Sequence, residues 1–192
     1  MKIVLSGAQC VGKSTILTML EEIQRKGDFF PNAVIIKEVV RTLMKERPDL
    51  KINKDADHIS QCAILEQHYR NCLKYPSLVT DRGAIDAFIY GTYSYLEHKF
   101  TLEEHLEHKR IFELSIPYYD IIFYLPPEID IKYDGVRDID PNYQQDIHKL
   151  FLSAFNTYHL PLVVELTGTV EERLTLMFNA IRNYLTHYPQ KK

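Results

Sequence analysis

The segment from residue 7 to residue 15 carries the strongest chemical signature in the chain. It matches the Walker A pattern G-x-x-x-x-G-K-[ST], in which Gly7 and Gly12 allow backbone angles that turn several N–H groups toward one point. Lys13 can reach the outer phosphates of a nucleotide as a point charge, and the Ser14 hydroxyl can ligate Mg²⁺. The segment predicts a loop that binds ATP with magnesium, made of Gly7, Ala8, Gln9, Cys10, Val11, Gly12, Lys13, Ser14 and Thr15.

A second candidate group is Asp81 with Arg82, which directly follow the apolar run at residues 78–80. An acid at such a position can hold Mg²⁺ or its water, or take a proton from the acceptor of a phosphoryl group. The alternative is that Asp81 caps the helix predicted from Ala84. Arg82 either binds an anion of the acceptor or pairs with a surface acid. We predict that Asp81 is catalytic and a metal ligand, and that Arg82 binds substrate.

Glu38 and Arg41 form a third group, just beyond the second predicted strand and three residues apart on one helical face. They either form an intrahelical ion pair or face an acceptor. In the second case the carboxylate binds hydroxyls and the guanidinium binds an anion or a ring. Their position at the carboxyl end of a strand favours the acceptor site, so both are predicted to bind substrate.

The polar segment at residues 128–140 shows no periodicity and predicts a mobile loop, within a lid of about 128–145. Arg137 lies in its Asp-Gly-Val-Arg run. An arginine on a closing loop can exclude water and neutralise charge at the transferred phosphoryl group, so we predict that Arg137 is catalytic. The alternative is a solvated loop charge. Farther along, residues 167–169 (Thr-Gly-Thr) either contact an adenine ring or form an ordinary turn with a helix cap.

Five short apolar runs, separated by helical patterns, must position these residues. Strands are predicted at 2–6, 33–37, 78–80, 121–125 and 162–166, and helices at 13–26, 39–46, from 55 or 57 to 75, 84–97, 102–115, 142–158 and after 169. Such alternation predicts a parallel sheet covered on both faces, with right-handed crossovers. Ligands bind at the carboxyl ends of these strands. The fold class is therefore α/β, a three-layer P-loop sandwich around a five-stranded parallel sheet.

Length and composition argue against several classes of protein. A length of 192 residues fits one domain, and the net charge of −3 argues against a generally basic nucleic-acid binder. The three cysteines form no C-x-x-C pair, which argues against a zinc ribbon and fits a reducing compartment. No apolar run is long enough for a membrane span or a signal peptide, so we predict a cytoplasmic protein.

Two further patterns come close to known site motifs but do not match them. His105 and His108 lie among Glu103, Glu104 and Glu107, but without the order H-E-x-x-H, which predicts a solvated helix face. Residues 53–56 miss the guanine-reading N-K-x-D by one position, because Ala56 stands where the aspartate would be. With no D-x-x-G in the chain, a GTPase switch is disfavoured.

Seven blocks, taken in order along nearly the whole chain, resemble the kinase-like P-loop proteins grouped with the ribosylnicotinamide kinase domain of bacterial NadR. They are residues 7–15, 38–41, 61–69, 80–83, 119–123, 134–137 and 160–165. The resemblance implies a nucleoside-kinase-like fold, ATP and Mg²⁺, a helical lid bearing Arg137, and transfer of a γ-phosphoryl group to a small hydroxyl acceptor. The run Thr80-Asp81-Arg82 is closer to the Asp-Arg of nucleoside monophosphate kinases, which leaves the acceptor open.

Three functions follow from these observations. The leading one is an ATP-dependent kinase acting on a hydroxyl or phosphate of a nucleoside, nucleotide or similar small acceptor. The second is a nucleic-acid kinase, for example one that phosphorylates a hydroxymethylated base in DNA, which requires a basic rim. The third is a regulatory P-loop NTPase whose nucleotide switches a partner.

Overall fold

The computed structural model describes residues 1–27, 30–52, 55–128 and 140–187. Five strands form one parallel sheet in the order β2-β3-β1-β4-β5. The strands are β1 (Lys2–Ser6), β2 (Val34–Ile36), β3 (Leu78–Asp81), β4 (Ile121–Tyr124) and β5 (Leu162–Glu165). The predicted parallel sheet is confirmed, and the carboxyl ends of all its strands lie along one edge.

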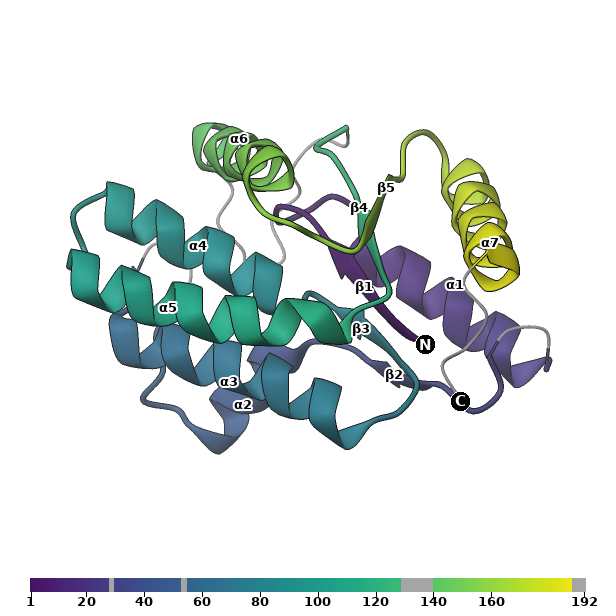
Figure 1. Ribbon diagram of the computed structural model, residues 1–192, viewed down its shortest axis with the longest axis horizontal. Helices are drawn as coiled ribbons and strands as arrows, with labels where there is room; N and C mark the ends of the chain where they lie inside the picture. Colours follow the sequence, from purple (N-terminus) through teal and green to yellow (C-terminus); the bar gives the residue numbers. More distant parts are fainter. Residues whose placement is uncertain (28–29, 53–54, 129–139, 188–192) are drawn as a thin grey trace.

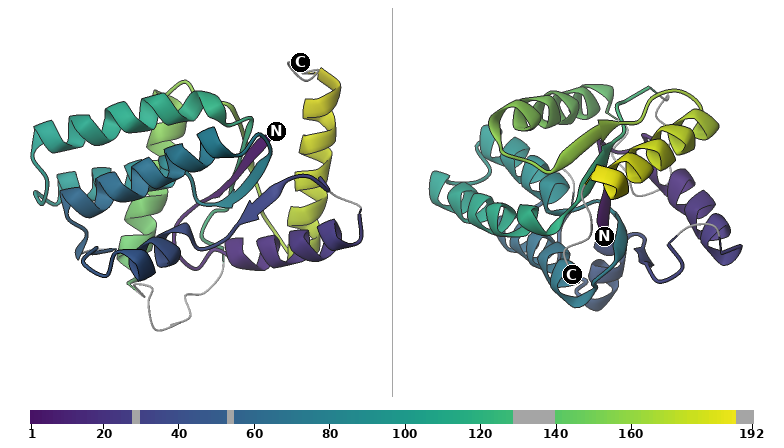
Figure 2. Two further views of the ribbon diagram at one scale, coloured as in Figure 1. Left: turned by 90° about the horizontal axis from the view of Figure 1, so that it is seen from below. Right: turned by 45° about the vertical axis from the view of Figure 1, so that its right-hand side comes forward.

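Helices cover both faces of this sheet and complete the three-layer arrangement. Figures 1 and 2 show α1 and α7 on one side and the other five α-helices on the opposite side, with α3, α4 and α5 packed alongside one another. The helices are α1 (Lys13–Arg25), α2 (Val39–Glu46), α3 (His58–Lys74), α4 (Ala84–Leu96), α5 (Leu102–Ser115), α6 (Pro141–Thr157) and α7 (Val170–His187).

Local sequence signals explain where several helices begin. Asp57 caps α3 by accepting a hydrogen bond from the Ser60 N–H, which selects Asp57 over Asp55 as the predicted cap. Thr101 and Glu104 form a reciprocal capping box at the start of α5. Asp140 caps α6, with Pro141 in the first turn, where a missing N–H costs nothing.

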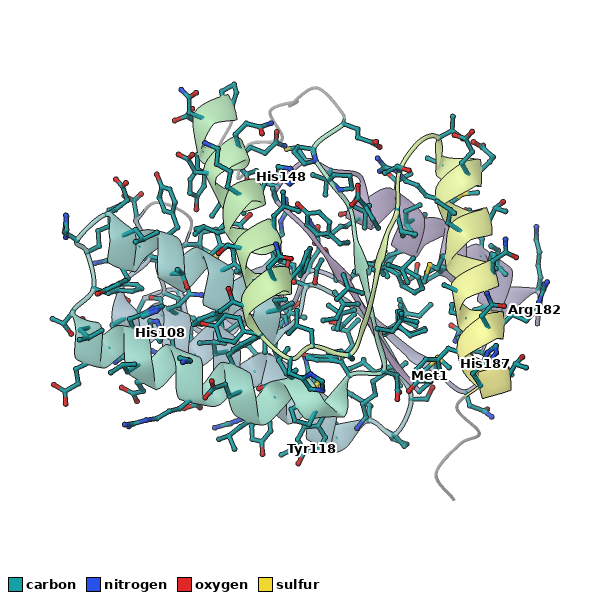
Figure 3. The ribbon with its side chains drawn as sticks, turned by 45° about the horizontal axis from the view of Figure 1, so that its top comes forward. Met1, His108, Tyr118, His148, Arg182 and His187 are labelled. Atoms are coloured by element: carbon teal, nitrogen blue, oxygen red, sulfur yellow. The ribbon has the colours of Figure 1, made fainter. Side chains whose placement is uncertain are left out.

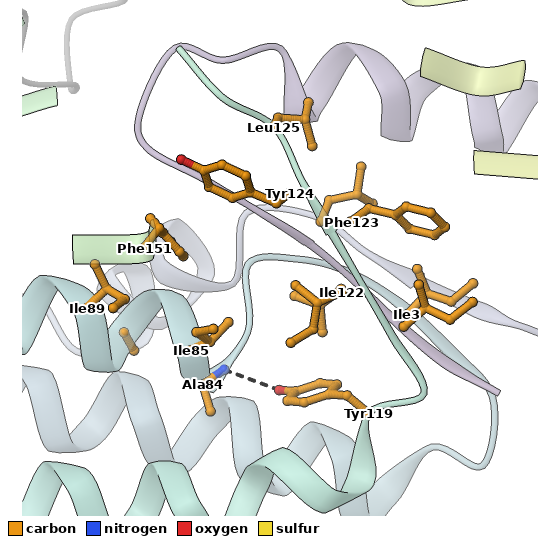
Figure 4. Packing of buried hydrophobic residues seen from close by; sticks show 14 of the residues in the cluster. Ile3, Ala84, Ile85, Ile89, Tyr119, Ile122, Phe123, Tyr124, Leu125 and Phe151 are labelled. Atoms are coloured by element: carbon orange, nitrogen blue, oxygen red, sulfur yellow. Dashed lines mark hydrogen bonds between the residues drawn. The ribbon is translucent and has the colours of Figure 1, made fainter. Parts of the chain in front are cut away.

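The core lies on both faces of the sheet, where the strands pack against the helices. Strands β3 and β4 are buried along their whole length, and β1 from its second residue on, whereas the edge strands β2 and β5 are partly exposed. Figure 4 shows Ile122 and Tyr124 of β4 packed with Ile85 and Ile89 of α4, beside the hydrogen bond that the Ala84 N–H donates to the Tyr119 hydroxyl (3.2 Å). Full burial of each such side chain contributes roughly 1.5–3 kcal/mol, so the central strands anchor the sheet.

The predicted elements and the observed ones agree to within a few residues. The second strand is shorter than predicted, covering Val34–Ile36, and the third extends one residue farther to include Asp81. Within the described part of the chain, no helix is both long and apolar enough to cross a bilayer. Most of the predicted lid, residues 129–139, lies outside the described residues, while its last part forms the first turns of α6.

Candidate active site

The loop at residues 7–12 connects β1 to α1 at the carboxyl edge of the sheet. Gly7 has a φ of +139°, and a Cβ there would lie 2.4 Å from the Leu125 carbonyl oxygen, so a larger residue cannot replace it without moving β4. Gly12 is left-handed and is the N-cap of α1. No side chain of the described residues caps this helix and its first turn holds no acid, so its first N–H groups remain suited to an external anion.

The Lys13 side chain is folded back over this loop. It is only 6% exposed, and its ammonium donates hydrogen bonds to the carbonyls of Gly7 (2.9 Å) and Ala8 (2.6 Å). Phosphate binding requires the ammonium to exchange these carbonyls for phosphate oxygens. Lys13 is the first residue of α1, and its ammonium lies over the loop, where it is predicted to bind the outer phosphates of a nucleotide.

The buried carboxylate of Asp86, which is not among the predicted site residues, holds the loop in place. Asp86, 1% exposed, accepts hydrogen bonds from the Ser6 hydroxyl (2.7 Å), the Gly7 N–H (3.2 Å) and the Gly83 N–H (3.0 Å). Burial raises the pKa of Asp86, while the nearby Arg82 and Lys13 cations oppose that rise. Asp86 therefore ties β1, the loop and α4 to one another.

Arg82 completes this network. Its guanidinium donates to the Gly7 carbonyl (3.1 Å) and to Asp86 (3.3 Å), and also to the Tyr90 hydroxyl (3.3 Å). The predicted alternative of pairing with an acid is thus observed, but the acid is buried rather than at the surface. The Tyr90 hydroxyl in turn donates to the Gln9 side chain (3.0 Å), which extends the network to the crown of the loop.

Asp81 ends β3 beside the loop, paired in register with Leu5 of β1. The N-cap of α4 is Gly83, with Asp86 as the capping acid, so the alternative that Asp81 caps this helix is wrong. Asp81 is 8% exposed, and its Oδ1 has no hydrogen-bond partner among the described residues. A buried carboxylate oxygen without a protein donor fits a hard cation, as does the Ser14 hydroxyl at the start of α1. These two oxygens would hold Mg²⁺.

Glu38 and Arg41 lie beyond the carboxyl end of β2. Arg41 pairs with Glu38 at 3.0 Å, so the intrahelical ion pair is observed, and both side chains are partly exposed. Glu38 adopts the left-handed conformation (φ 50°), as do Arg82 after β3 (φ 66°) and Cys10 after β1 (φ 62°). Such conformations cost energy for residues with a Cβ, and three of the five found among the described residues lie at this edge of the sheet.

The opposite side of the loop is held by Arg173 of α7. It is 2% exposed and donates to the Val11 carbonyl (2.8 Å) and to Glu128 (2.8 Å), which also accepts from the Gly168 N–H (3.0 Å). Thr169 and Glu172 bond reciprocally at the start of α7, so the ordinary turn with a helix cap is observed at residues 167–169. Contact with adenine there stays a prediction.

A third contact comes from α6. The Gln144 amide, buried within the range predicted as lid, donates to the Gln9 carbonyl (2.7 Å). Arg137 lies outside the described residues, and its predicted role stays a prediction.

Taken together, the parallel sheet, the glycine loop over α1 and the buried lysine define a P-loop nucleotide-binding protein with the fold of small kinases. The sequence matches a protein family described as "AAA domain" over residues 2–173. The chain belongs to this family.

Three proteins are similar to this chain over most of its length. The chain is 27% identical over 204 aligned residues to a guanylate kinase of Onion yellows phytoplasma (strain OY-M), covering 95% of this chain and 91% of that protein. A NadR protein solved in complex with NR superposes with a TM-score of 0.69 at 17% identity, covering 100% of this chain and 53% of that one. The chain therefore spans about half the length of that NadR protein.

A second solved structure is similar over nearly its entire length. Deoxyadenosine kinase from M. mycoides, with the products dCMP and dCDP, gives a TM-score of 0.64 at 18% identity, covering 95% of this chain and 99% of that one. Both structures share the P-loop fold of this chain, which confirms the fold class and, at the level of fold, the resemblance to NadR.

Proposed function

We propose that this protein is an ATP-dependent kinase that transfers the γ-phosphoryl group to a hydroxyl or phosphate of a nucleoside, nucleotide or similar small acceptor. The observation that carries the proposal is the placement of two charged groups at neighbouring strand ends. Lys13 lies over the loop after β1. Asp81, whose Oδ1 has no hydrogen-bond partner in the part of the chain that the structure describes, ends β3 beside it. Phosphoryl transfer requires a cation that neutralises charge on the phosphates and a carboxylate that holds the metal or accepts the proton of the acceptor.

The residues of this chain have distinct roles in the proposed reaction. When bound, ATP with Mg²⁺ supplies the phosphoryl group and part of the charge neutralisation. Lys13 stabilises the negative charge that grows between the β- and γ-phosphates. Asp81 positions the metal or accepts the proton of the acceptor, and Arg137 neutralises charge on the transferred group. Their loop is kept in shape by Asp86 and Arg173.

Glu38, Arg41 and Arg82 are the proposed acceptor-binding residues. Glu38 and Arg41 present a carboxylate and a guanidinium together at the end of β2. Such a pair suits an acceptor with hydroxyls and one anion or ring. A partly exposed pair can exchange its mutual contact for contacts with a ligand at modest cost. Arg82 already donates through Nη1 and Nη2 to the Gly7 carbonyl, Asp86 and Tyr90, so it would bind the acceptor through its remaining N–H groups or by exchanging one of these bonds.

The similar proteins support a nucleoside-type acceptor. One is named for a nucleotide substrate, guanylate, and one for a nucleoside, deoxyadenosine, while the NadR structure holds NR. A net charge of −3 also favours a compact acceptor over a long polyanion.

The first test is a Lys13→Ala variant with Lys26→Ala as its control. Lys26 is exposed just after the end of α1, so its removal preserves the loop. Loss of Lys13 should cost several kcal/mol of barrier and reduce phosphoryl transfer by about 10²-fold or more. Near-normal turnover in Lys13→Ala would contradict the proposal.

The second test identifies the acceptor. The wild type is offered labelled ATP with free nucleosides, nucleoside monophosphates and hydroxymethylated duplex DNA in parallel. We expect label in a small acceptor, and a higher KM for that acceptor in Arg41→Ala but not in Lys45→Ala, an exposed cation on the same helix. Label only in the DNA would favour the nucleic-acid kinase. Nucleotide hydrolysis with no labelled acceptor would favour the regulatory NTPase.

A further inference from the structure

Far from the loop along the chain, three potential metal ligands come together between α3 and α5. They are His58 and Cys62, one turn apart on α3, and His108 of α5. The predicted solvated face is wrong for His108, which is completely buried, and Figure 3 shows it among the helices of the larger layer. One possible ligand atom from each residue lies within 4.8 Å of the other two.

The separations of these atoms fit one tetrahedral ion. His58 Nδ1 lies 3.1 Å from His108 Nε2 and 3.8 Å from Cys62 Sγ. With zinc bonds of about 2.0–2.1 Å to nitrogen and about 2.3 Å to sulfur, two nitrogens of a tetrahedral site lie about 3.4 Å apart and nitrogen and sulfur about 3.6 Å apart. The two separations from His58 therefore need changes of only a few tenths of an ångström, and the third, between Cys62 and His108, lies within 4.8 Å and must close to about 3.6 Å.

The surroundings supply one outer contact of the kind that metal sites use. Glu107 Oε2 lies 3.3 Å from the other ring nitrogen of His58, Nε2, so a proton held there fixes His58 with Nδ1 toward the metal. Burial and the charges of Glu107, Glu66 and Glu104 raise the pKa of the Cys62 thiol, so its thiolate requires a cation bound beside it. Gly91 of α4 makes room for the second histidine, since a Cβ there would lie 3.0 Å from the His108 ring.

We propose that His58, Cys62 and His108 bind a divalent transition-metal ion of the zinc class, cross-linking α3 to α5. Two imidazoles and a thiolate favour zinc or cobalt over magnesium or calcium, which prefer oxygen ligands. Binding displaces the Cys62 proton to solvent and leaves a fourth position for water. The ion would stabilise the helical layer rather than take part in phosphoryl transfer.

The same cluster can also be held together by hydrogen bonds without a metal. At 3.1 Å, His108 Nε2–H can donate to His58 Nδ1, and His58 Nε2–H to Glu107, which forms a hydrogen-bonded chain without any metal. In that arrangement Cys62 contributes little, and metal does not change stability. The metal site instead requires a Cys62 thiolate, so the cysteine distinguishes the two.

The experiment uses the full chain, stripped with chelator and titrated with Co²⁺. We expect one equivalent to produce a thiolate-to-cobalt charge-transfer band and the intense visible bands of tetrahedral cobalt, both displaced by Zn²⁺. Cys62→Ser should remove the charge-transfer band, and both Cys62→Ser and His58→Ala should weaken binding by about tenfold or more. His187→Ala, which removes an exposed imidazole on α7, should bind as the wild type does.

Thermal unfolding with Zn²⁺ or with chelator gives a second readout, because a ligand that binds only the folded state raises Tm. We expect zinc to raise the Tm of the wild type and not of Cys62→Ser, while the two proteins unfold at similar temperatures in chelator. Stoichiometric cobalt binding that survives Cys62→Ser, or no binding by the wild type, would overturn the proposal. So would a Tm loss in His58→Ala that is the same with and without zinc.

Discussion

Arg173 donates a hydrogen bond to the main-chain carbonyl of Val11, a residue 162 positions earlier in the chain. The same guanidinium pairs with Glu128, which accepts from the Gly168 N–H. One buried cation therefore joins the phosphate loop, the segment after β4 and the turn before α7. The nucleotide loop depends on a helix that contributes no residue to the Walker A pattern.

Replacing Arg173 by Met should damage both stability and nucleotide binding. The variant leaves the Val11 carbonyl without its donor and Glu128 without its cation, which should cost about 2–4 kcal/mol of unfolding free energy. Chemical denaturation and the KM for ATP measure the two effects. Arg182→Met, at an exposed position on the same helix, should change neither. Equal behaviour of the two variants would show that the contact with Val11 is dispensable.

Asp81→Asn should fold normally and lose most of its kcat. Its Oδ1 has no hydrogen-bond partner within the described residues and it caps no helix, so the folded state loses little. The charge that positions the metal or accepts a proton is lost, which we expect to lower kcat by about 10²-fold or more. Steady-state kinetics and thermal unfolding, done together, separate these effects. Retained activity with reduced stability would assign Asp81 to the fold instead.

Asp86→Asn should show the reverse pattern for stability. The amide replaces an oxygen that accepts from N–H groups with a donor, and it removes the salt-bridge partner of the partly buried Arg82. We expect a loss of about 2–4 kcal/mol in unfolding free energy, measured in urea. A loss no greater than that of Asp81→Asn would contradict the role given to this carboxylate.

Arg137→Ala should lower kcat more than it weakens ATP binding, because the proposed role of this arginine is to stabilise charge in the transition state. Comparison of kcat with the dissociation constant for ATP tests this. Lys132→Ala, which removes another cation of the same segment, is the control. Equal kcat in Arg137→Ala and the wild type would place the arginine on the solvent side.

The stability of the protein should fall in mild acid. Burial lowers the pKa of His68 to about 3, and neither of its ring nitrogens has a partner within the part of the chain that the structure describes. Because the unfolded chain binds this proton at a pH near 6.5, the stabilisation is complete above that pH and is lost as pH falls from 6.5 toward 3.

His68→Leu should reduce this dependence by up to about 1.4 kcal/mol per pH unit over that window. Urea unfolding at several pH values between 4 and 7 measures the slope. The variant at the exposed His187, His187→Leu, should keep the slope of the wild type. An unchanged slope in His68→Leu would mean that this histidine is not held neutral by burial.

The sequence predicted the fold well because the signals that determine it are local. Apolar strands, helix periodicity and the glycine loop are each read from a few neighbouring residues, as at Gly7 and Gly12. The network that fixes the loop is not local. Asp86 reads as one residue of an apolar helix, and only its spacing of four from Arg82 hints at their pairing.

Other parts of the site give still weaker signals in the sequence. Arg173 looks like one of several charges on an amphipathic helix, although it is among the most buried side chains. His108 sits among glutamates, which suggested a solvated face, yet tertiary packing of α5 against α3 and α4 buries it completely. In both cases burial is decided by a partner far along the chain.

The central position of β1 in the sheet has a consequence for how the chain matures during synthesis. This strand leaves the ribosome before both of its sheet neighbours, β3 and β4, which begin at Leu78 and Ile121. The Val11 carbonyl gains its hydrogen-bond donor later still, after Arg173 has been translated. The phosphate loop is thus made well before the contacts that hold it in place, so the nascent chain gains a competent nucleotide site only after Arg173 of α7 has been made.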